Sequence, residues 1–249
     1  MEVIGIKMEK LRIVTTSWDD GHPLDMELMK LLKKYNLKGT FYVPISNPEQ
    51  EVMSEKDLRI LSTDFEIGAH TLSHQDLTKI QLRDAKEEIL EGKKQLEAIL
   101  GKEVKMFCYP KGHYNRQIIN LVKETGFIGA RTVEQYRISP PKNPFAMWTT
   151  IHVHPQSYRK YFGHISRNKN LVALTYLRYF GCLKPNFVGT SKYFFDHVYK
   201  HGGVFHLWGH SWEIERFGLW EELEEVFEYI SNKKNVIYVS NGDLINRFL

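Results

Sequence analysis

Two short motifs place carboxylates and imidazoles directly after strand-like segments. Asp19 and Asp20 are adjacent and follow one apolar, β-branched run, and His70 and His74, spaced His-x-x-x-His, follow another. In folds that alternate strands and helices, the loops after the strands gather at one face, which carries the chemistry. Two carboxylates and two imidazoles that meet there can bind one divalent metal and leave one free base. The motifs therefore predict metal-assisted hydrolysis.

The segments around these motifs alternate between strand and helix patterns. The expected strands are short, rich in Val, Ile, Phe and Tyr, and bounded by Gly, Pro or Asn. They cover 12–18, 39–43, 65–69, 105–109, 127–131, 149–153, 204–208 and 236–239. Such repeated strand-helix units predict a parallel sheet, either closed as a barrel or open and doubly wound.

Helices are expected between these strands. Helical spacing of apolar residues is clearest over 79–100, where Thr78 with Gln81 predicts a capping box at the start. Ser54 predicts the start of a shorter helix in the same way. Two further helices are expected over 23–35 and 219–231.

One segment departs from the alternation of strands and helices. The segment 155–200 is aromatic, basic and longer than a usual crossover, so we expect a helical or loop insertion there. Its aromatic residues are more typical of core packing than of a substrate groove. With no linker or internal repeat, residues 1–249 are expected to form a single catalytic domain.

The composition is that of a soluble globular protein. Of 249 residues, 42% are hydrophobic and 26% are charged, and the formal net charge is +4. Lys and Arg are spread along the chain, so nucleic acid is not an expected partner. No apolar run reaches the ~20 residues needed to span a membrane. With only two cysteines, Cys108 and Cys182, no disulfide framework is expected. The N-terminal residues lack the apolar core of a signal peptide. We expect a cytoplasmic protein; a precursor whose signal is missing from this sequence is the alternative.

Three further motifs accompany the first two in a fixed order. They are Gly39-Thr40-Phe41-Tyr42-Val43, Tyr109-Pro110-Lys111-Gly112 and Trp208-Gly209-His210. The set resembles the polysaccharide deacetylase family, carbohydrate esterase family 4, with its NodB-homology domain, from about Val14 to about Phe248. The resemblance implies an α/β fold, a distorted (β/α) barrel of about seven parallel strands. It also implies a bound divalent metal and removal of acetyl groups from the nitrogen or oxygen of carbohydrates.

The resemblance also implies a metal site. Asp20, His70 and His74 resemble the family's metal ligands. Two imidazoles and one carboxylate suit Zn²⁺, and Co²⁺ or Ni²⁺ would fit the same set.

The catalytic roles follow from the same comparison. Asp19 resembles the base, and the backbone N–H of Lys111 matches the position that helps to hold the oxyanion. His210 resembles the acid, because Trp208-Gly209-His210 stands where the family has Leu-x-His. Asp19 would take a proton from water, and His210 would protonate the leaving nitrogen or oxygen.

A substrate surface is expected beside these groups. His206, Trp208 and His210 alternate along one strand and project to the same face, so His206 could line the same pocket and is the rival acid. Aromatic rings that flank the site suit stacking on a sugar ring. The aromatic residues expected there are Trp18, Tyr109, Trp208 and Trp212.

The chain departs from the family pattern at two points. Many members have an arginine that braces the catalytic aspartate where this chain has Cys108, which supplies neither the charge nor the fork geometry. Arg131, at the end of the next strand, is the expected replacement, with an ordinary structural arginine as the alternative. The family's fourth motif, whose aspartate polarises the acid histidine, has no clear match near Trp148.

Other polar residues receive structural interpretations. His152 and His154 alternate on an expected strand and could approach the site, but solvated or core histidines are the favoured interpretation. Trp212 with Glu213 could simply form the next turn.

Three functions remain open on the sequence. The first is a metal-dependent deacetylase of an acetylated carbohydrate. The second, made credible by the two departures, is a hydrolase of a C–N bond in a non-sugar amide or imide on the same fold. The third is a non-enzymatic carbohydrate-binding or scaffold protein. The presence of all five polar site residues argues against it; these are Asp19, Asp20, His70, His74 and His210.

Overall fold

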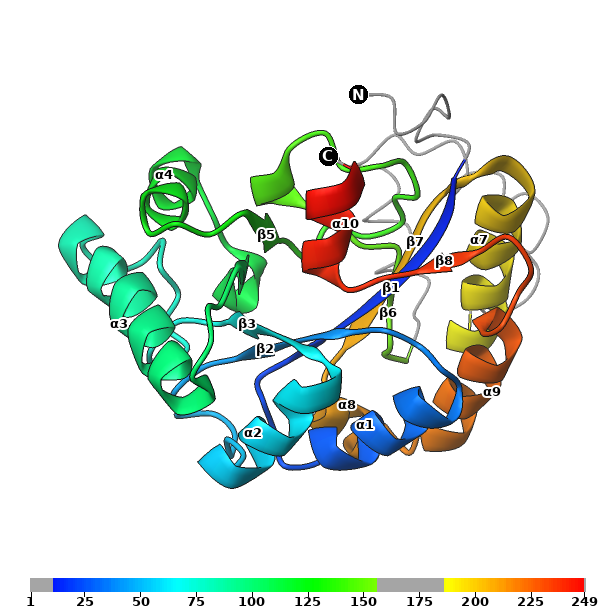
Figure 1. Cartoon of the computed structure of the whole chain (residues 1–249), viewed down its shortest axis with the longest axis horizontal. Coiled ribbons are helices and arrows are strands. Elements are labelled where there is room, and N and C mark those ends of the chain that lie inside the picture. Colours follow the sequence, from blue (N-terminus) through cyan, green and yellow to red (C-terminus); the bar gives the residue numbers. More distant parts are fainter. Residues whose placement is uncertain (1–10, 156–185, 249) are drawn as a thin grey trace.

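A parallel β-sheet of eight strands organises the protein (Figure 1). The computed structural model describes residues 11–155 and 186–248. Seven strands follow one another in the order β5-β4-β3-β2-β1-β7-β6, and β8 pairs with β1. The strands are β1 (Arg12–Asp19), β2 (Thr40–Val43), β3 (Glu66–Ala69), β4 (Met106–Cys108), β5 (Gly129–Arg131), β6 (Ile151–His152), β7 (Gly203–Gly209) and β8 (Ile237–Tyr238). Each of the eight strands predicted from the sequence is present, with its ends shifted by up to two residues.

Helices cover the outside of this curled sheet, except the C-terminal helix, α10, which packs against the apolar cluster inside the curl (Figure 1). They are α1 (Asp25–Lys34), α2 (Glu55–Asp64), α3 (Leu82–Leu100), α4 (Arg116–Glu124), α7 (Phe187–His201), α8 (Ser211–Phe217), α9 (Trp220–Ile230) and α10 (Asn241–Phe248), with short 3₁₀ turns at Pro110–Gly112 and Pro144–Ala146. Ser54 caps α2 as predicted, because its side chain accepts a hydrogen bond from the Asp57 backbone N–H. None of the helices in the described parts of the chain is long and apolar enough to cross a membrane.

The predicted capping box of the third helix is wrong. The helix begins at Leu82, so Gln81 is itself the N-cap residue, and its side chain makes no capping bond. Thr78 lies outside the helix, where its hydroxyl donates to Asp76 at 2.7 Å. A local turn around Asp76 therefore uses the hydroxyl that the spacing had suggested for a cap.

The two faces of the sheet bury different side chains. Successive residues of a strand point to opposite faces, and parallel strands are usually buried on both. On the outer face, a large apolar cluster that includes Val14, Trp18 and Phe41 packs beneath the helices. Inside the curl, a smaller cluster contains Ile13 and Tyr42. This alternation decides which residues of β1 can reach the interior and the site above it.

Asn241, the first residue of α10, joins strands inside the curl. Its backbone N–H donates to the Thr40 hydroxyl at 2.9 Å, and its amide donates to the Tyr42 hydroxyl at 3.0 Å. Its amide oxygen accepts from Thr15 at 2.9 Å. All of these groups are buried, so α10 supplies hydrogen-bond partners to polar atoms of the sheet that water does not reach.

The insertion predicted over 155–200 is described only in part. Its last stretch forms α7, whose Phe194 and Phe195 are buried in the outer cluster, as the core-packing interpretation predicted. The earlier aromatic residues, Tyr158, Tyr161, Phe162, Tyr176, Tyr179 and Phe180, lie outside the described residues. The prediction of a single domain over 1–249 stays a prediction.

The architecture agrees with the predicted fold class. The seven sequential strands curl with β5 and β6 as the edges of the sheet. Among the described residues no ladder joins these two edge strands, so the barrel is a distorted one. The predicted distorted (β/α) barrel is therefore confirmed.

Candidate active site

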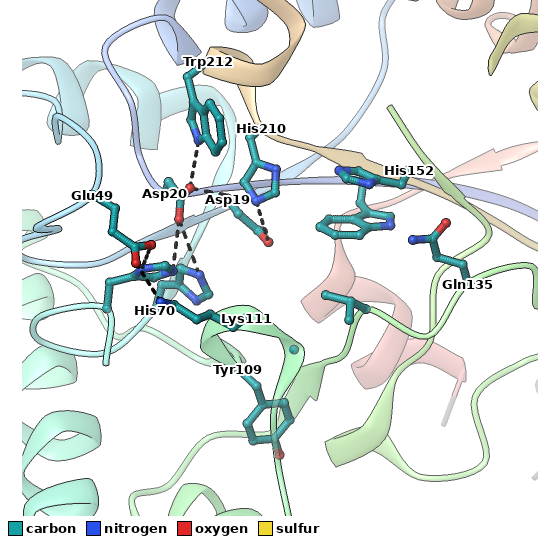
Figure 2. A pocket seen from close by; sticks show the side chains of 14 residues that line it. Asp19, Asp20, Glu49, His70, Tyr109, Lys111, Gln135, His152, His210 and Trp212 are labelled. Atoms are coloured by element: carbon teal, nitrogen blue, oxygen red, sulfur yellow. Dashed lines mark hydrogen bonds and ion pairs between the residues drawn. The ribbon is translucent and has the colours of Figure 1, made fainter. Parts of the chain in front are cut away.

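A cavity of about 380 Å³ opens where the loops after several strands meet (Figure 2). This volume lies in the range of small-molecule sites. Its lining includes every carboxylate and imidazole of the two opening motifs. The lining residues are Asp19, Asp20, Glu49, His70, His74, Tyr109, Lys111, Gly112, Val133, Gln135, His152, Trp208, His210 and Trp212.

Asp19 and Asp20 reach the same cavity because the chain turns sharply between them. Neighbours on a regular strand would point to opposite faces. Asp20, however, has a φ of 77°, in the left-handed region, and Gly21 follows with a φ of 59°. A side chain at Gly21 would also place its Cβ 2.6 Å from the Val43 Cγ1. The strained turn at the end of β1 is therefore what brings both carboxylates to one site.

Asp20, His70 and His74 converge as a set of metal ligands would. Asp20 Oδ1 lies 3.3 Å from His74 Nε2 and 3.7 Å from His70 Nε2. Two atoms each bound at about 2.1 Å to one tetrahedral ion would lie about 3.4 Å apart. Asp20 Oδ1 is buried and has no hydrogen-bond partner among the described residues. A buried carboxylate oxygen without a donor, facing two imidazole nitrogens, fits a cation as its partner.

The tautomer of His70 is fixed from behind the site. Its Nδ1 lies 2.9 Å from the Cys108 carbonyl oxygen, so Nδ1–H donates there and Nε2 presents its lone pair to the cavity. Burial lowers the pKa of His70 to about 4, which keeps the ring in the neutral form that binds metals. His74 lies at the turn that follows, with a φ of 55°.

Helix α3 holds the loop between the two histidines. The Leu72 backbone N–H donates to the Glu88 carbonyl at 3.0 Å, and the Glu88 carboxylate accepts from both the backbone N–H and the hydroxyl of Ser73. Gly92, one turn further, lets the loop approach, because a Cβ there would lie 2.6 Å from the Thr71 carbonyl carbon. The spacing of the ligands therefore depends on contacts that are distant in the sequence.

Arg131 lies against Asp19, as the sequence predicted. Its guanidinium forms a buried ion pair with Asp19 Oδ1, and neither side chain is appreciably exposed. Cys108, which replaces the expected arginine, pairs in register with Arg131, so the arginine comes from the next strand at the same height. Burial raises the pKa of Asp19, but Arg131, with smaller contributions from His70 and His210, brings it below its usual value, so the carboxyl is held ionised.

His210 stands over both carboxylates. Its Nε2 lies 3.9 Å from Asp19 Oδ2 and 3.9 Å from Asp20 Oδ2. Its Nδ1 lies 2.6 Å from Glu213 Oε2, which accepts the Nδ1–H. Burial lowers the pKa of His210, but Glu213 and then the two aspartates raise it to about 9. The ring therefore holds a proton that its Nε2 can deliver into the cavity.

Glu213 is a further site residue, although its sequence context predicted only a turn. It accepts from His210 and lies 3.1 Å from His152 Nε2. Residues 211–217 form α8, so the three-residue spacing from His210 puts the carboxylate back against the imidazole. The three-residue spacing between His210 and Glu213 was therefore the feature of the sequence that could have predicted this pair. Trp148, in the region where the family has the carboxylate that polarises the acid, instead donates its indole N–H to the Ser139 carbonyl at 2.7 Å.

The far wall of the cavity is aromatic. Trp208 lines it as predicted, and His152 stacks on its ring at 4.0 Å with an interplanar angle of 12°. His152 therefore belongs to the pocket wall, which was the less favoured of the two interpretations of its sequence. Burial lowers the pKa of His152 to about 4, so this imidazole is neutral.

Lys111 and Tyr109 form the opposite rim (Figure 2). Lys111 has a left-handed backbone with a φ of 58°, and its Nζ pairs with Glu49 at 2.7 Å. Tyr109 lines the cavity, and its hydroxyl donates to the Phe145 carbonyl at 2.9 Å. The hydroxyl is therefore engaged away from any substrate, while the ring closes the wall.

Two residues predicted to bind substrate do not reach the cavity. Trp18 is fully buried on the outer face, with its ring 6.0 Å from that of Phe227, because it alternates with the inward-facing Asp19. His206 faces inward but lies four residues before His210, about 13 Å lower along the strand. It is buried there against Ser17, 2.9 Å from the hydroxyl. Both predictions of substrate contact are wrong.

Two solved structures share this fold over most of their length. A candidate polysaccharide deacetylase from Mycobacterium smegmatis aligns with a TM-score of 0.68 at 14% identity, covering 96% of this chain and 91% of that one. The chitin deacetylase of the fungus Colletotrichum lindemuthianum aligns with a TM-score of 0.61 at 13% identity, covering 96% and 89%. At such identities the likeness shows the fold.

The sequence comparison adds the family. A peptidoglycan-N-acetylglucosamine deacetylase from Bacillus cereus is 27% identical over 117 residues, which cover 46% of this chain and 42% of that protein. The matches span less than half the length of the curated relatives. The polysaccharide deacetylase family itself matches residues 7–130, a stretch that holds Asp19, Asp20, His70 and His74. The chain belongs to the polysaccharide deacetylase family.

Proposed function

We propose that this protein is a metal-dependent hydrolase that removes acetyl groups from an acetylated carbohydrate. One observation carries the proposal: the two aspartates at the end of β1, the two histidines after β3 and the histidine after β7 meet in a single cavity. Family membership supports the reaction class, since the family is one of polysaccharide deacetylases.

Asp20, His70 and His74 would hold the metal, and two imidazoles with one carboxylate suit Zn²⁺. When bound, a divalent ion of this kind polarises the acyl carbonyl and makes water a better nucleophile near neutral pH. Three protein ligands leave an open position beside the cavity.

Asp19 would act as the base. It faces the cavity next to Asp20, and its ion pair with Arg131 holds it in one orientation. An ionised carboxylate can accept a proton from the attacking water. Arg131 would thus be a positioning residue that aims Asp19 and keeps it charged.

His210 would act as the acid. Glu213 takes the Nδ1–H, which leaves Nε2–H on the side of the cavity. As the carbon–nitrogen or carbon–oxygen bond breaks, this proton would pass to the leaving atom. The backbone N–H of Lys111 would donate to the developing oxyanion, a contribution of a few kcal/mol for one such donor.

The aromatic wall would receive the sugar. The rings of Trp208 and His152 form a stacked pair along the cavity, and flat apolar surfaces suit the apolar face of a pyranose. The alternative of a non-sugar C–N hydrolase was motivated by a missing arginine beside Asp19 and a missing carboxylate beside His210. Arg131 pairs with Asp19 and Glu213 pairs with His210, so this motive no longer applies.

The proposal is tested by metal content and acetate release on the same samples. We expect about one metal ion per purified chain, with acetate released from N-acetylated oligosaccharides. His74→Ala should lose both. His201→Ala, which alters an exposed histidine of α7, should keep both. Metal without acetate release would move the proposal to a non-sugar substrate, and the absence of metal under every loading condition would refute the metal site.

A further inference from the structure

The two oxygens of the Asp20 carboxylate have different surroundings (Figure 2). Oδ1 faces His70 and His74 and has no hydrogen-bond donor among the described residues. Oδ2 accepts a hydrogen bond from the indole N–H of Trp212 at 2.9 Å. The carboxylate is buried, with 3% of the residue exposed, so water does not average these environments.

Trp212 is held in place by its own helix. It lies in the first turn of α8, two residues after His210, and its ring lies 5.4 Å from the His210 ring at an angle of 40°. His210 Nε2 is the other polar atom near Asp20 Oδ2, but at 3.9 Å it is beyond hydrogen-bond distance. Among the described residues, the indole is therefore the one hydrogen-bond donor to this carboxylate.

We propose that Trp212 is a positioning residue for the metal, which fixes Asp20 as a ligand through Oδ1 alone. This inference rests on the proposed metal site. A carboxylate can bind an ion through one oxygen or through both. A donor on Oδ2 favours the first mode, because binding through both oxygens would break a buried hydrogen bond and leave the indole N–H unpaired. One-oxygen binding leaves a coordination position free for water or the acyl oxygen.

The chain offers a matched control for this role. Trp220 donates its indole N–H to the carboxylate of Glu215 at 2.6 Å, on the exposed surface of α9 and away from the cavity. Trp212→Phe and Trp220→Phe therefore remove the same chemical bond, once beside the site and once elsewhere. Each substitution retains an aromatic ring, so the packing against His210 is largely kept.

Zinc affinity, measured by competition with a chelator, is the first readout. We expect W212F to bind Zn²⁺ roughly 10- to 100-fold more weakly than the wild type, as is usual when a hydrogen bond to a metal ligand is removed. W220F should bind like the wild type. The visible absorption of the Co²⁺-loaded proteins is the second readout, because it reports the coordination number. The W212F spectrum should differ from the other two.

Unfolding of the metal-free proteins shows whether each variant is folded, and W212Y, which also lacks the indole N–H, serves if W212F is not. Equal zinc affinity in W212F and the wild type would overturn the inference while the proposed function stands. Weaker binding with an unchanged Co²⁺ spectrum would overturn it too, since that pattern reports a structural role. A wild type that binds no metal would overturn both.

Discussion

At the scale of single residues, the proposed base, Asp19, depends on an arginine from the strand next to the one where the family pattern led us to expect it. The register that pairs Cys108 with Arg131 puts the guanidinium beside Asp19, where it also packs over the Trp208 ring at 4.6 Å. The thiol of Cys108 is itself buried, 3.8 Å from Asp19 Oδ2. Arg131 on β5 thus places beside Asp19 the positive charge that the family pattern has at position 108 on β4.

Arg131→Met should destabilise the protein strongly. Removal of one partner leaves the Asp19 charge buried and unpaired, which costs about 3–5 kcal/mol in the free energy of unfolding. The double variant D19N/R131M, which removes both charges, should recover most of that loss. Denaturant unfolding at neutral pH measures both.

Arg247→Met is the control for this comparison. Arg247 pairs with Asp243 at 3.5 Å on the surface, so its loss should change stability by less than about 1 kcal/mol. A double variant as unstable as R131M would show that the arginine acts through packing and not through the ion pair.

Glu213→Gln should weaken the acid and shift its pH dependence. The carboxylate raises the pKa of His210, so its neutral replacement should lower that pKa by about one to two units. Since the acid must be protonated, activity is lost as the pH rises through its pKa. The basic limb of the kcat profile should therefore move to lower pH, with kcat reduced roughly 10- to 100-fold.

A kcat–pH profile of E213Q beside Glu221→Gln, an exposed carboxylate of α9, makes the test specific. E221Q should match the wild type. An unmoved basic limb in E213Q would mean that Glu213 does not set the protonation of the acid.

At the scale of elements, the two histidines proposed as metal ligands depend on the contact between α3 and the loop after β3. Gly92 faces the loop backbone, and Glu88 holds it through three hydrogen bonds. Two loop residues, Thr71 and His74, have left-handed backbones, with φ of 71° and 55°. The helix therefore sustains a conformation that the loop would not adopt alone.

Gly92→Ala should reverse the usual effect of that substitution. In the interior of a helix, alanine is normally favoured over glycine by about 1 kcal/mol. Here the new methyl would meet the Thr71 backbone, so we expect a loss of about 1–3 kcal/mol from overpacking. Zinc affinity should fall as well, because the loop carries His70 and His74.

Thermal unfolding with and without zinc measures both effects. Gln95→Ala, on the exposed side of the same helix, should change stability by less than about 0.5 kcal/mol. A G92A variant that is more stable than the wild type and binds zinc normally would contradict this prediction, because the loop would then move away from the added methyl without displacing the two histidines.

At the scale of the whole molecule, the metal would join the loop after β1 to the loop after β3. Asp20 and the two histidines lie about 50 residues apart in the sequence, and a ligand that binds only the folded state stabilises it by mass action. At a free zinc concentration 100 times the Kd, the gain is about 2.7 kcal/mol. For a chain of this size, that corresponds to a rise of about 5–10 °C in Tm.

Calorimetry of the metal-free protein, repeated after zinc is added, tests this. The rise should be reversed by a chelator and should be absent in His74→Ala. A zinc-dependent rise that persists in H74A would place the ion elsewhere.

Much of the architecture was determined by local sequence patterns. Short β-branched and aromatic runs bounded by glycine, proline or asparagine predicted all eight strands, because those signals act over a few neighbouring residues. The positions of Asp19, Asp20, His70 and His74 directly after two such strands predicted that they would meet, because the loops after parallel strands share one face.

Only the tertiary structure decided how the strands pair in register, which face of the sheet each side chain points to, and how far each lies from the cavity. Pairing of β4 with β5 set Arg131 level with Cys108, and alternation along β1 turned Trp18 outward beside an inward Asp19. His206 shares a face with His210 yet lies below the cavity, and α8 folds Glu213 back onto the acid. These outcomes depend on contacts between segments far apart in the chain, which no local pattern of residues encodes.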